Sequence, residues 1–315
     1  MRAGKQTTLR ARADLTGNGV HSGISSALSI NPAPAGTGIV FIRTLDDGSE
    51  REIRVAPHAV AATEFATVLG DASGALVSTV EHILASLYGL GVDNAIVDVT
   101  GPEVPILDGS AAQFVEAIER AGVVELKAPR RYLRILNPIG VTSGSSYGEL
   151  RPYDRGFRLE VEIDFAHALV GRQSIALDMD AAVFRRELAR ARTFGFVRDV
   201  TRLWSAGYAL GATFENTLVV AEERILNPGG LRYPDEFVRH KALDAMGDLA
   251  LAGMPIIGAY RSIRGGHRLN HAVLCALLSD RSAWSVETQQ PSRRLRGHAG
   301  FGIALAQPAF APDVS

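Results

Sequence analysis

The sequence predicts an α+β fold made of two similarly built domains. Its 315 residues suit two domains of roughly 150 residues each, and a hydrophobic share of 46% is enough to fill two cores. The order helix, strand, turn, helix occurs twice, in residues 80–121 and again in 238–278, with a histidine near the start of the first helix each time. We therefore expect domains at 1–128 and 129–290, joined by the charged stretch around Pro129.

The first half of the chain opens with strands. Apolar and polar residues alternate from Thr7 to Asn31 on both sides of a glycine cluster, which indicates two strands joined by a tight turn. Four further short segments are typical of strands: 39–43, 51–55, 66–69 and 94–99.

The helical spacing of apolar residues predicts the two helices of this half. The first is expected to have Ser78 or Thr79 as its cap and to end at Gly89 and Gly91. The second opens with a capping box at Ser110.

The second half repeats this order. A helix from Val238 to about Gly253 precedes a strand at 256–263 and a helix at about 270–278. The stretch 181–220 leads from a helical segment into glycine-broken apolar sequence, which suggests an insertion. The final residues, 291–315, are expected to be poorly ordered.

Charge and cysteine content exclude several classes of protein. Lys and Arg total 33 against 34 Asp and Glu, a net charge of −1, which argues against a protein whose main task is to bind nucleic-acid phosphates. The single cysteine, Cys275, excludes an internal disulfide and a cysteine-rich zinc site. The longest nearly uncharged apolar stretch, 249–260, is far below the ~20 residues that span a bilayer, and no secretory leader opens the chain. We expect a cytoplasmic protein.

The strongest chemical signal is the segment VRHKALDAMGD at 238–248. Residues four apart lie on one face of a helix, so His240 and Asp244 present an imidazole and a carboxylate together, with Asp248 one turn further along. Zinc accepts such ligands. A solvated His/Asp pair on a surface helix fits the spacing equally well.

A catalytic zinc site needs a third protein ligand and a carboxylate that takes a proton from water. Glu81 and His82, at the start of the first predicted helix, offer both residue types. Taken alone, Glu81 equally fits an acidic first-turn residue favoured by the helix dipole, and His82 fits an ordinary core histidine better than a ligand. The other histidines that are candidates for the third ligand are His21, His58, His167, His267, His271 and His298.

Three further residues suit either chemistry or ordinary structure. His267 follows a glycine pair, which permits close approach to a substrate but also forms simple turns. Lys241 suits a phosphate or carboxylate contact, and Thr193 suits a hydrogen bond to an oxyanion; both residue types also occur at surfaces and turns. No G-x-S-x-G elbow and no Walker loop is present in the sequence.

Five motifs follow one another along the chain. They are GNGVHSG at 17–23, TVEH at 79–82, PILDGS at 105–110, RTFGF at 192–196 and FVRHKALD at 237–244. Together they closely resemble the UDP-3-O-acyl-N-acetylglucosamine deacetylases, the zinc amidases of lipid A biosynthesis in Gram-negative bacteria. The resemblance implies two layered α/β sandwich domains, each with an insertion, and it favours the zinc interpretation over the surface pair.

The resemblance also implies a metal site and a base. One zinc ion per chain is implied at His82, His240 and Asp244, with Fe²⁺ as an alternative that tolerates the same ligands. Glu81 is implied as the general base. Zinc polarises a carbonyl and lowers the pKa of bound water to about 7, and hydrolysis of an amide at neutral pH requires both effects.

Further catalytic roles follow from the same resemblance. His267 is implied as the general acid or oxyanion stabiliser, oriented by Asp248. Thr193 is implied as a hydrogen-bond donor to the oxyanion. Lys241 is implied as a substrate contact that Asp108 holds in place.

The substrate contacts are implied in the same way. Phe194 and Asp199 match positions that line the sugar and diphosphate site, and Asp164 and Phe165 match positions near the uridine. A βαβ-type insertion at about 194–224 is implied as the passage for the acyl chain. Its expected lining residues are Val200, Leu203, Trp204 and Leu210.

One departure from the family pattern is visible. Ser145, Ser146 and Tyr147 stand where the family has a lysine associated with the diphosphate. Arg151 or Arg172 is a candidate to compensate for the missing cation.

The implied activity is removal of the acetyl group from UDP-3-O-acyl-N-acetylglucosamine, which gives the free amine and acetate. We expect a monomer with no nucleic-acid partner. Two alternatives remain open: a related deacetylase that acts on another acylated amino sugar, which the missing lysine favours, and a binding protein that keeps the zinc scaffold without turnover.

Overall fold

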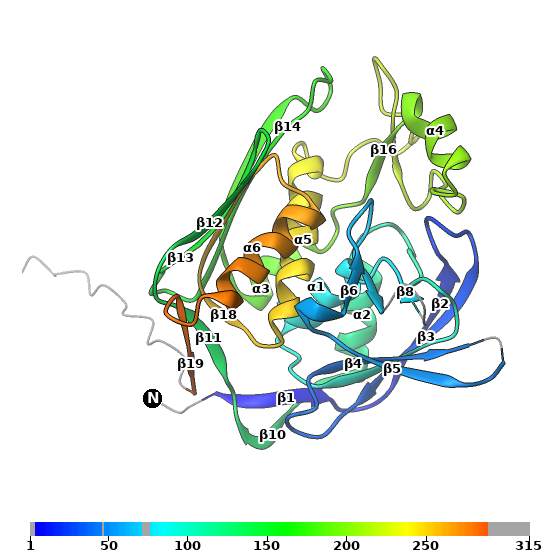
Figure 1. The fold of residues 1–315 in the computed structure, drawn as a ribbon. Helices are drawn as coiled ribbons and strands as arrows, with labels where there is room; N and C mark the ends of the chain where they lie inside the picture. Colours follow the sequence, from blue (N-terminus) through cyan, green and yellow to red (C-terminus); the bar gives the residue numbers. More distant parts are fainter. Residues whose placement is uncertain (1–3, 46, 71–75, 289–315) are drawn as a thin grey trace, which may run out of the picture.

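The computed structural model describes residues 4–45, 47–70 and 76–288. Helices and strands are mixed along the chain, which confirms the expected α+β class (Figure 1). The predicted tail at 291–315 lies outside the described residues. Within the described part, none of the helices combines the length and apolar character needed to cross a bilayer.

The first half of the chain forms a five-stranded sheet in the order β2-β3-β9-β4-β5. Its strands are β2 (Ala13–Asn18), β3 (Ser25–Pro32), β4 (Ile39–Thr44), β5 (Glu50–Arg54) and β9 (Ala95–Val99). β2 and β3 form the expected hairpin around the glycine cluster, and β4 runs parallel to β9. A separate pair joins β1 (Lys5–Leu9) to β10 (Val123–Pro129), so the chain leaves this half beside the point where it entered.

The second half forms a seven-stranded sheet around β18, which pairs with β11, β13 and β14. Its strands are β11 (Tyr132–Ile135), β12 (Ile139–Ser143), β13 (Ser146–Arg151), β14 (Phe157–Asp164), β15 (Arg172–Met179), β18 (Ile256–Ile263) and β19 (Trp284–Glu287). Only β18 was expected from the sequence. β14 nevertheless alternates apolar and charged residues, and its apolar side chains are the buried ones.

Four helices lie between the two sheets (Figure 1). They are α1 (Glu81–Leu90), α2 (Ala112–Ala121), α5 (Glu236–Leu249) and α6 (His267–Ser279). α1 packs against α5 and α2, α2 contacts β2, and α6 contacts β12 and β13. Buried residues of both halves form a single hydrophobic cluster, so the boundary between two domains stays a prediction.

Two small sheets stand apart from these layers. Residues of the first half form β6 (Val60–Ala62), β7 (Val68–Gly70) and β8 (Leu76–Val77). In the second half, β16 (Phe194–Phe196) runs parallel to β17 (Leu218–Val220), and the short helix α4 (Val200–Ser205) lies between them in sequence. Before this unit, α3 (Ala181–Val183) continues into a π-helical turn at Phe184–Leu188. Figure 1 shows α4 and β16 together at one end of the molecule.

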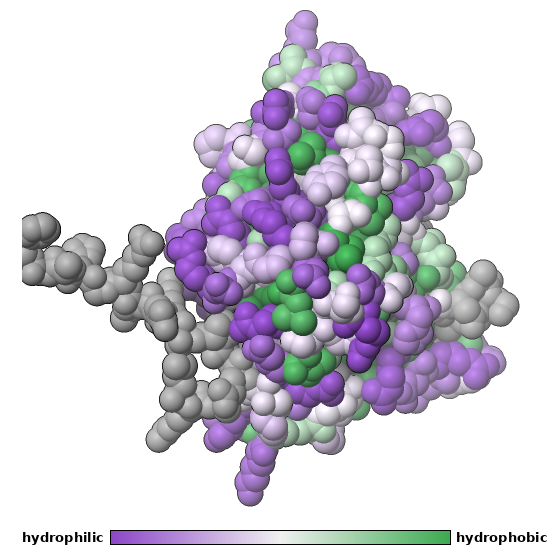
Figure 2. Space-filling view, turned by 60° about the vertical axis from the view of Figure 1, so that its left-hand side comes forward, coloured by the Kyte–Doolittle hydropathy of each residue, from purple (hydrophilic) through white to green (hydrophobic). Residues whose placement is uncertain are grey.

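The distribution of polar and apolar residues fits a core enclosed between the two sheets. Figure 2 shows hydrophilic residues over much of one face, with hydrophobic patches along its middle. Isolated apolar residues on a surface are normal, and the large apolar side chains such as Phe41, Phe114 and Phe237 are fully buried.

The start of α1 differs from the prediction. Val80 occupies the cap position without a side-chain cap, and neither Ser78 nor Thr79 fills that role. Thr79 instead donates its hydroxyl hydrogen bond to Glu103 at 2.8 Å, so its side chain is already engaged. Gly91 ends the helix with φ 74°, as expected for a left-handed C-terminal residue, whereas Gly89 lies inside the last turn.

The predicted starts of two other helices were also wrong. The capping box at Ser110 does not form: Ala111 is the cap residue, and the Ser110 hydroxyl accepts from the Ala112 N–H at 3.1 Å. α6 begins at His267, three residues before the expected Asn270, because Gly266 is extended and the helix follows it at once. His267 is therefore the first residue of a helix rather than part of a turn.

Candidate metal centre and active site

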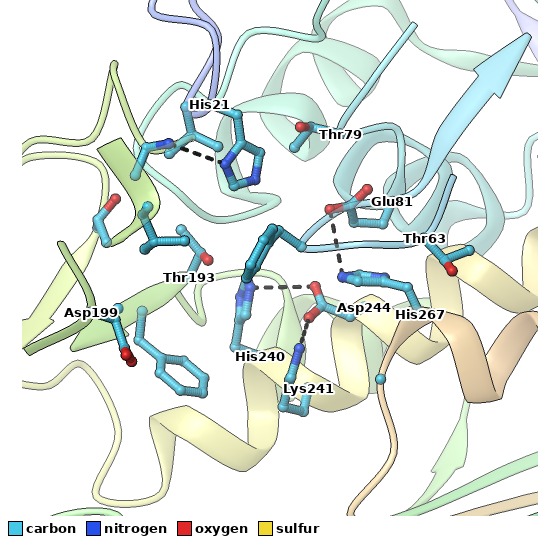
Figure 3. A pocket seen from close by; sticks show the side chains of 18 of the residues that line it. His21, Thr63, Thr79, Glu81, Thr193, Asp199, His240, Lys241, Asp244 and His267 are labelled. Carbon is cyan, nitrogen blue, oxygen red and sulfur yellow. Dashed lines mark hydrogen bonds and ion pairs between the residues drawn. The ribbon is translucent and has the colours of Figure 1, made fainter. Parts of the chain in front are cut away.

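A cavity of about 550 Å³ lies where the N-terminal ends of α1 and α6, the middle of α5 and the β16–β17 unit meet. Figure 3 shows Glu81 and His267 on one side of Asp244, with Thr193 and Asp199 on the far side of His240. The sequence-predicted residues that line this cavity are Glu81, His82, Phe165, Thr193, Phe194, Asp199, Leu203, His240, Lys241, Asp244 and His267.

Three buried side chains come together at the cavity floor. His82, His240 and Asp244 offer ligand atoms that all lie within 4.8 Å of one another. Oδ1 of Asp244 is 3.6 Å from Nε2 of His82 and 3.3 Å from Nε2 of His240. α1 supplies the first histidine, and α5 supplies the other two residues one turn apart, as the H-x-x-x-D spacing predicts.

His240 is held in the form that ligates a metal. Its Nδ1–H donates to the carbonyl oxygen of Ala191 at 3.0 Å, which leaves the lone pair of Nε2 toward Asp244 and His82. Burial lowers the pKa of His240 to about 4, so its imidazole is neutral at pH 7.

Asp244 is held as a carboxylate. Its Oδ2 accepts a hydrogen bond from Nζ of Lys241 at 2.8 Å. Burial acts to raise the pKa of Asp244, but the neighbouring His240 and Lys241 outweigh it and hold that pKa well below its usual range. Burial likewise acts to lower the pKa of Lys241, and Asp244 reverses the direction and raises it.

These donors fit a divalent metal ion. Oδ1 of Asp244 is buried and has no hydrogen-bond partner among the described residues, although a buried carboxylate oxygen without a partner is costly. The same oxygen faces the Nε2 atoms of His82 and His240. Two imidazoles and one carboxylate are a donor set that zinc accepts, and they leave further coordination positions open. His82 is thus the side chain that could serve as the third ligand, which H-x-x-x-D alone left unassigned.

Glu81 and His267 form a second pair beside the cluster. Oε1 of Glu81 is 3.9 Å from Nε2 of His267. Burial raises the pKa of Glu81 against the attraction of the histidines. Burial acts to lower the pKa of His267, but Asp248 and Glu81 outweigh it and raise the pKa to about 9, so the ring is a cation at pH 7. The pair therefore holds one proton acceptor and one proton donor.

A buried network supports this pair from behind. Nδ1 of His267 is 2.9 Å from Oδ2 of Asp248, and Nδ2 of Asn270 donates to the same oxygen at 2.8 Å. The hydroxyl of Thr67 donates to the other oxygen of Asp248 at 2.5 Å, and Tyr260 donates to Asn270 at 2.6 Å. The sequence interpretation found Asp248 but missed the other three, because no local spacing links them to the motifs.

Close backbone packing joins the helices that carry these groups. A Cβ on Gly247 of α5 would lie 2.0 Å from the carbonyl oxygen of Glu81, so only glycine permits this approach of α5 to α1. The approach brings Glu81 and His82 beside the face of α5 that carries His240 and Asp244.

Backbone strain also concentrates at the cavity. Among the described residues, the non-glycine positions with positive φ are Phe65, Thr79, Leu107, Ala209 and Arg264. Four of them line the cavity, and the other follows the lining residue Ile106. Such a conformation costs about 1–3 kcal/mol, most for a β-branched residue such as Thr79. Strain gathered at one cavity is typical of a functional site.

The predicted partner of Lys241 was wrong. Asp108 pairs with Arg232 at 2.9 Å and accepts from the Ser110 hydroxyl at 2.8 Å, whereas Lys241 pairs with Asp244. Asp108 thus ties the PILDGS segment to the loop before α5 and lies outside the cavity lining.

The prediction that Arg151 or Arg172 compensates for the missing family lysine was also wrong. Arg151 pairs with Glu160 and Arg172 with Glu162, at 2.8 and 2.9 Å, and neither arginine lines the cavity. Ser146 does line it. The arginines of the cavity lining are Arg202, Arg264 and Arg268.

Several predicted substrate contacts lie apart from the cavity. Asp164 is absent from its lining and pairs with Arg264 at 3.5 Å, at the end of β14. Of the expected acyl-passage residues only Leu203 lines the cavity, while Val200, three residues earlier, is half-buried and Trp204 and Leu210 are exposed. Leu203 and Trp204 are adjacent in α4 and therefore point to different sides of it, and Leu210 lies beyond the end of this helix.

Comparison with known proteins agrees with this geometry. Residues 6–279 match the model of a family described as LpxC, UDP-3-O-acyl N-acetylglycosamine deacetylase. The chain belongs to this family. Proteins named UDP-3-O-acyl-N-acetylglucosamine deacetylase from Brucella ovis and Brucella abortus are 51% identical over 282 residues, which cover 89% of this chain and 98% of theirs. The protein of that name from Brucella melitensis is 50% identical over the same length. A chain of this family therefore carries a buried side-chain set that can hold a metal ion.

Proposed function

We propose that this protein is a zinc-dependent hydrolase that removes the acetyl group from UDP-3-O-acyl-N-acetylglucosamine in lipid A biosynthesis. The observation that carries the proposal is the juxtaposition of His82, His240 and Asp244 with an acid–base pair at the floor of one cavity. The family match, and relatives at 51% identity that bear this name, support the substrate class.

The metal ligands would be His82, His240 and Asp244. A zinc ion bound there supplies Lewis-acid polarisation of the amide carbonyl and of a water molecule. Lys241 keeps Asp244 ionised and fixes one of its oxygens, so the other oxygen stays directed at the ligand position.

The proton transfers fall to Glu81 and His267. The Glu81 carboxylate takes a proton from the attacking water, and burial raises its pKa toward the range in which a base works at neutral pH. The His267 cation gives its proton to the amide nitrogen as the carbon–nitrogen bond breaks, which yields acetate and the free amine. Asp248 fixes the imidazole ring through Nδ1, so Nε2 faces the cavity and Glu81.

The rest of the cavity suits the remaining parts of the substrate. Thr193 lies across the cavity from Glu81, where a carbonyl oxygen would lie, and Phe194 also lines the cavity and suits a sugar ring. Arg264 and Arg268 also line the cavity, and the carbonyl oxygen of Arg264 accepts from the Ser146 hydroxyl at 2.6 Å; guanidinium groups suit the diphosphate that a lysine contacts in the family pattern. Leu203 and Ala209 suit the acyl chain.

The test is metal analysis paired with a release-of-acetate assay. We expect one zinc ion per chain and release of acetate from the UDP-linked substrate. Equal turnover of a nucleotide-free acylated N-acetylglucosamine would favour the related deacetylase of another amino sugar. Zinc-loaded protein that binds the UDP-sugar but never releases acetate would overturn the proposal in favour of a binding protein.

A further inference from the structure

Thr67 contacts the proposed base and the proposed acid's partner at the same time. Its backbone N–H donates to Oε2 of Glu81 at 3.1 Å, and its hydroxyl donates to Oδ1 of Asp248 at 2.5 Å. The same hydroxyl oxygen is 3.3 Å from Nδ1 of His267. Thr67 is 1% exposed and is absent from the cavity lining, so it lies behind these groups and does not reach the substrate.

The backbone of Thr67 is fixed to the start of α1. Its carbonyl oxygen accepts from the N–H of Val80 at 3.3 Å, directly before Glu81. Its side chain reaches α5 through Asp248 and approaches the first residue of α6, His267. One residue therefore connects the three helices whose relative position sets the distance between base and acid.

The hydroxyl group completes the hydrogen bonding of Asp248. One carboxylate oxygen accepts from Asn270 and contacts His267, so the other has only Thr67 as its partner among the described residues. A carboxylate held at both oxygens cannot rotate about its χ2 torsion without losing a charge-assisted hydrogen bond. The orientation of the His267 ring therefore depends on the Thr67 hydroxyl.

We infer that Thr67 is a positioning residue that holds the Glu81 carboxylate and the His267 ring at the distance and orientation that consecutive proton transfers require. The inference rests on the proposed function, because it takes these two groups as base and acid. It assigns to Thr67 an effect on the chemical step and none on contact with the substrate.

The experiment compares two substitutions of opposite kind. Thr67→Val keeps the shape and the backbone N–H but removes the hydroxyl, whereas Thr67→Ser keeps the hydroxyl and removes the methyl group. We expect Thr67→Val to lower kcat between about tenfold and a hundredfold with KM within about twofold, since small displacements of reacting groups have costs of this size. Thr67→Ser should retain kcat within about threefold, and both variants should keep one metal ion per chain.

A matched control is Thr8→Val, which removes another buried threonine hydroxyl. Thr8 is 4% exposed and its hydroxyl accepts from the Ala33 N–H at 2.8 Å, away from the cavity. This variant should have wild-type kcat. If Thr67→Val does not fold by circular dichroism, Thr67→Ala and Thr67→Ser replace it, and equal kcat values for those two would overturn the inference.

Glu81→Gln, assayed beside these variants, separates this inference from the proposed function. Wild-type protein without acetate release would overturn the proposed function itself, whereas full activity of Glu81→Gln would remove Glu81 as the base and with it the premise of this inference. A strong loss in Glu81→Gln together with wild-type kcat in Thr67→Val would overturn only the role of Thr67. Loss of metal in Thr67→Val would likewise overturn it, since the effect would then act on the ligands.

Discussion

The floor and the rim of the cavity are built by different means. The floor consists of Glu81, His82, His240, Asp244 and His267, all at most 7% exposed and all carried by α1, α5 or α6. The rim is the β16–β17 unit with α4. Its large apolar side chains Trp204, Leu210 and Phe214 are 50–58% exposed.

This difference indicates where substitutions should lower the activity most. At the floor, each charged group is buried beside a partner, and removing one partner leaves the other uncompensated in a medium of low dielectric constant. At the rim, most side chains are half in water, so truncation changes little buried area. We therefore expect effects on activity to fall steeply from floor to rim.

The largest effect is expected at a metal ligand. His240→Ala removes one of three donors and the hydrogen bond to Ala191, so the metal content should fall from one per chain toward zero. We expect kcat/KM to fall by at least about 10³-fold, since water activation and carbonyl polarisation are both lost. Metal analysis and acetate release measure the two effects.

The matched control for this change is His271→Ala. His271 is a half-buried histidine of α6 whose Nε2 contacts the carbonyl oxygen of Pro57, outside the cavity. The His271→Ala variant should keep one metal ion per chain. Full metal retention in His240→Ala would remove that residue from the ligand set.

The next effect is expected at the base. Glu81→Ala should lower kcat by roughly 10²-fold or more while one metal ion per chain is retained, because the proposed role of Glu81 is proton transfer and it is not among the three proposed ligands. Glu116→Ala, which removes an exposed glutamate of α2, is the control and should leave kcat unchanged. An unaltered rate in Glu81→Ala would assign the proton transfer to another group.

The same contrast explains what the sequence could predict. His240, Asp244 and Asp248 follow helical periodicity, so the part of the site that α5 carries was predictable from spacing. Their meeting with His82 depends on the packing of α1 against α5, which no local spacing encodes; the family resemblance supplied it. Thr67 was not predicted to belong to the site, because it lies in a short irregular segment and makes its contacts through its backbone as well as its side chain.

The remaining errors concern side-chain partners and the strands of the second half. The partner of Lys241 was misassigned, since the i,i+3 contact to Asp244 on the same helix is available without any long-range contact. The predicted replacement cations lie on β13 and β15 and are already paired with glutamates of β14: Arg151 with Glu160 and Arg172 with Glu162. Strands β11–β15 were not predicted, although the alternation in β14 was a usable signal.

A smaller effect is expected at Arg268, in the wall of the cavity. Arg268 lines the cavity and is exposed, and no ion pair holds it within the described part of the chain. Arg268→Gln should raise KM for the UDP-linked substrate about fivefold with kcat nearly unchanged, since a charged contact is worth about 1 kcal/mol at an exposed site. The KM for a nucleotide-free substrate should not move.

The control is Arg261→Gln, which removes an exposed arginine of the neighbouring strand β18 outside the cavity lining. Its KM should match that of the wild type. An equal rise of KM for both substrates in Arg268→Gln would show that this arginine does not contact the nucleotide part.

The smallest effects are expected on the rim itself, in two adjacent residues of α4. Leu203 lines the cavity, whereas Trp204 is 58% exposed and donates its indole N–H to the carbonyl oxygen of Ala209 at 3.2 Å. Leu203→Ala should raise KM about threefold to fivefold for a long-chain substrate, since part of a buried leucine contact is worth about 1 kcal/mol. Trp204→Ala should change KM by less than about twofold. KM values for substrates of increasing acyl length measure this, and a larger effect at Trp204 than at Leu203 would show that the rim closes over the chain when substrate binds.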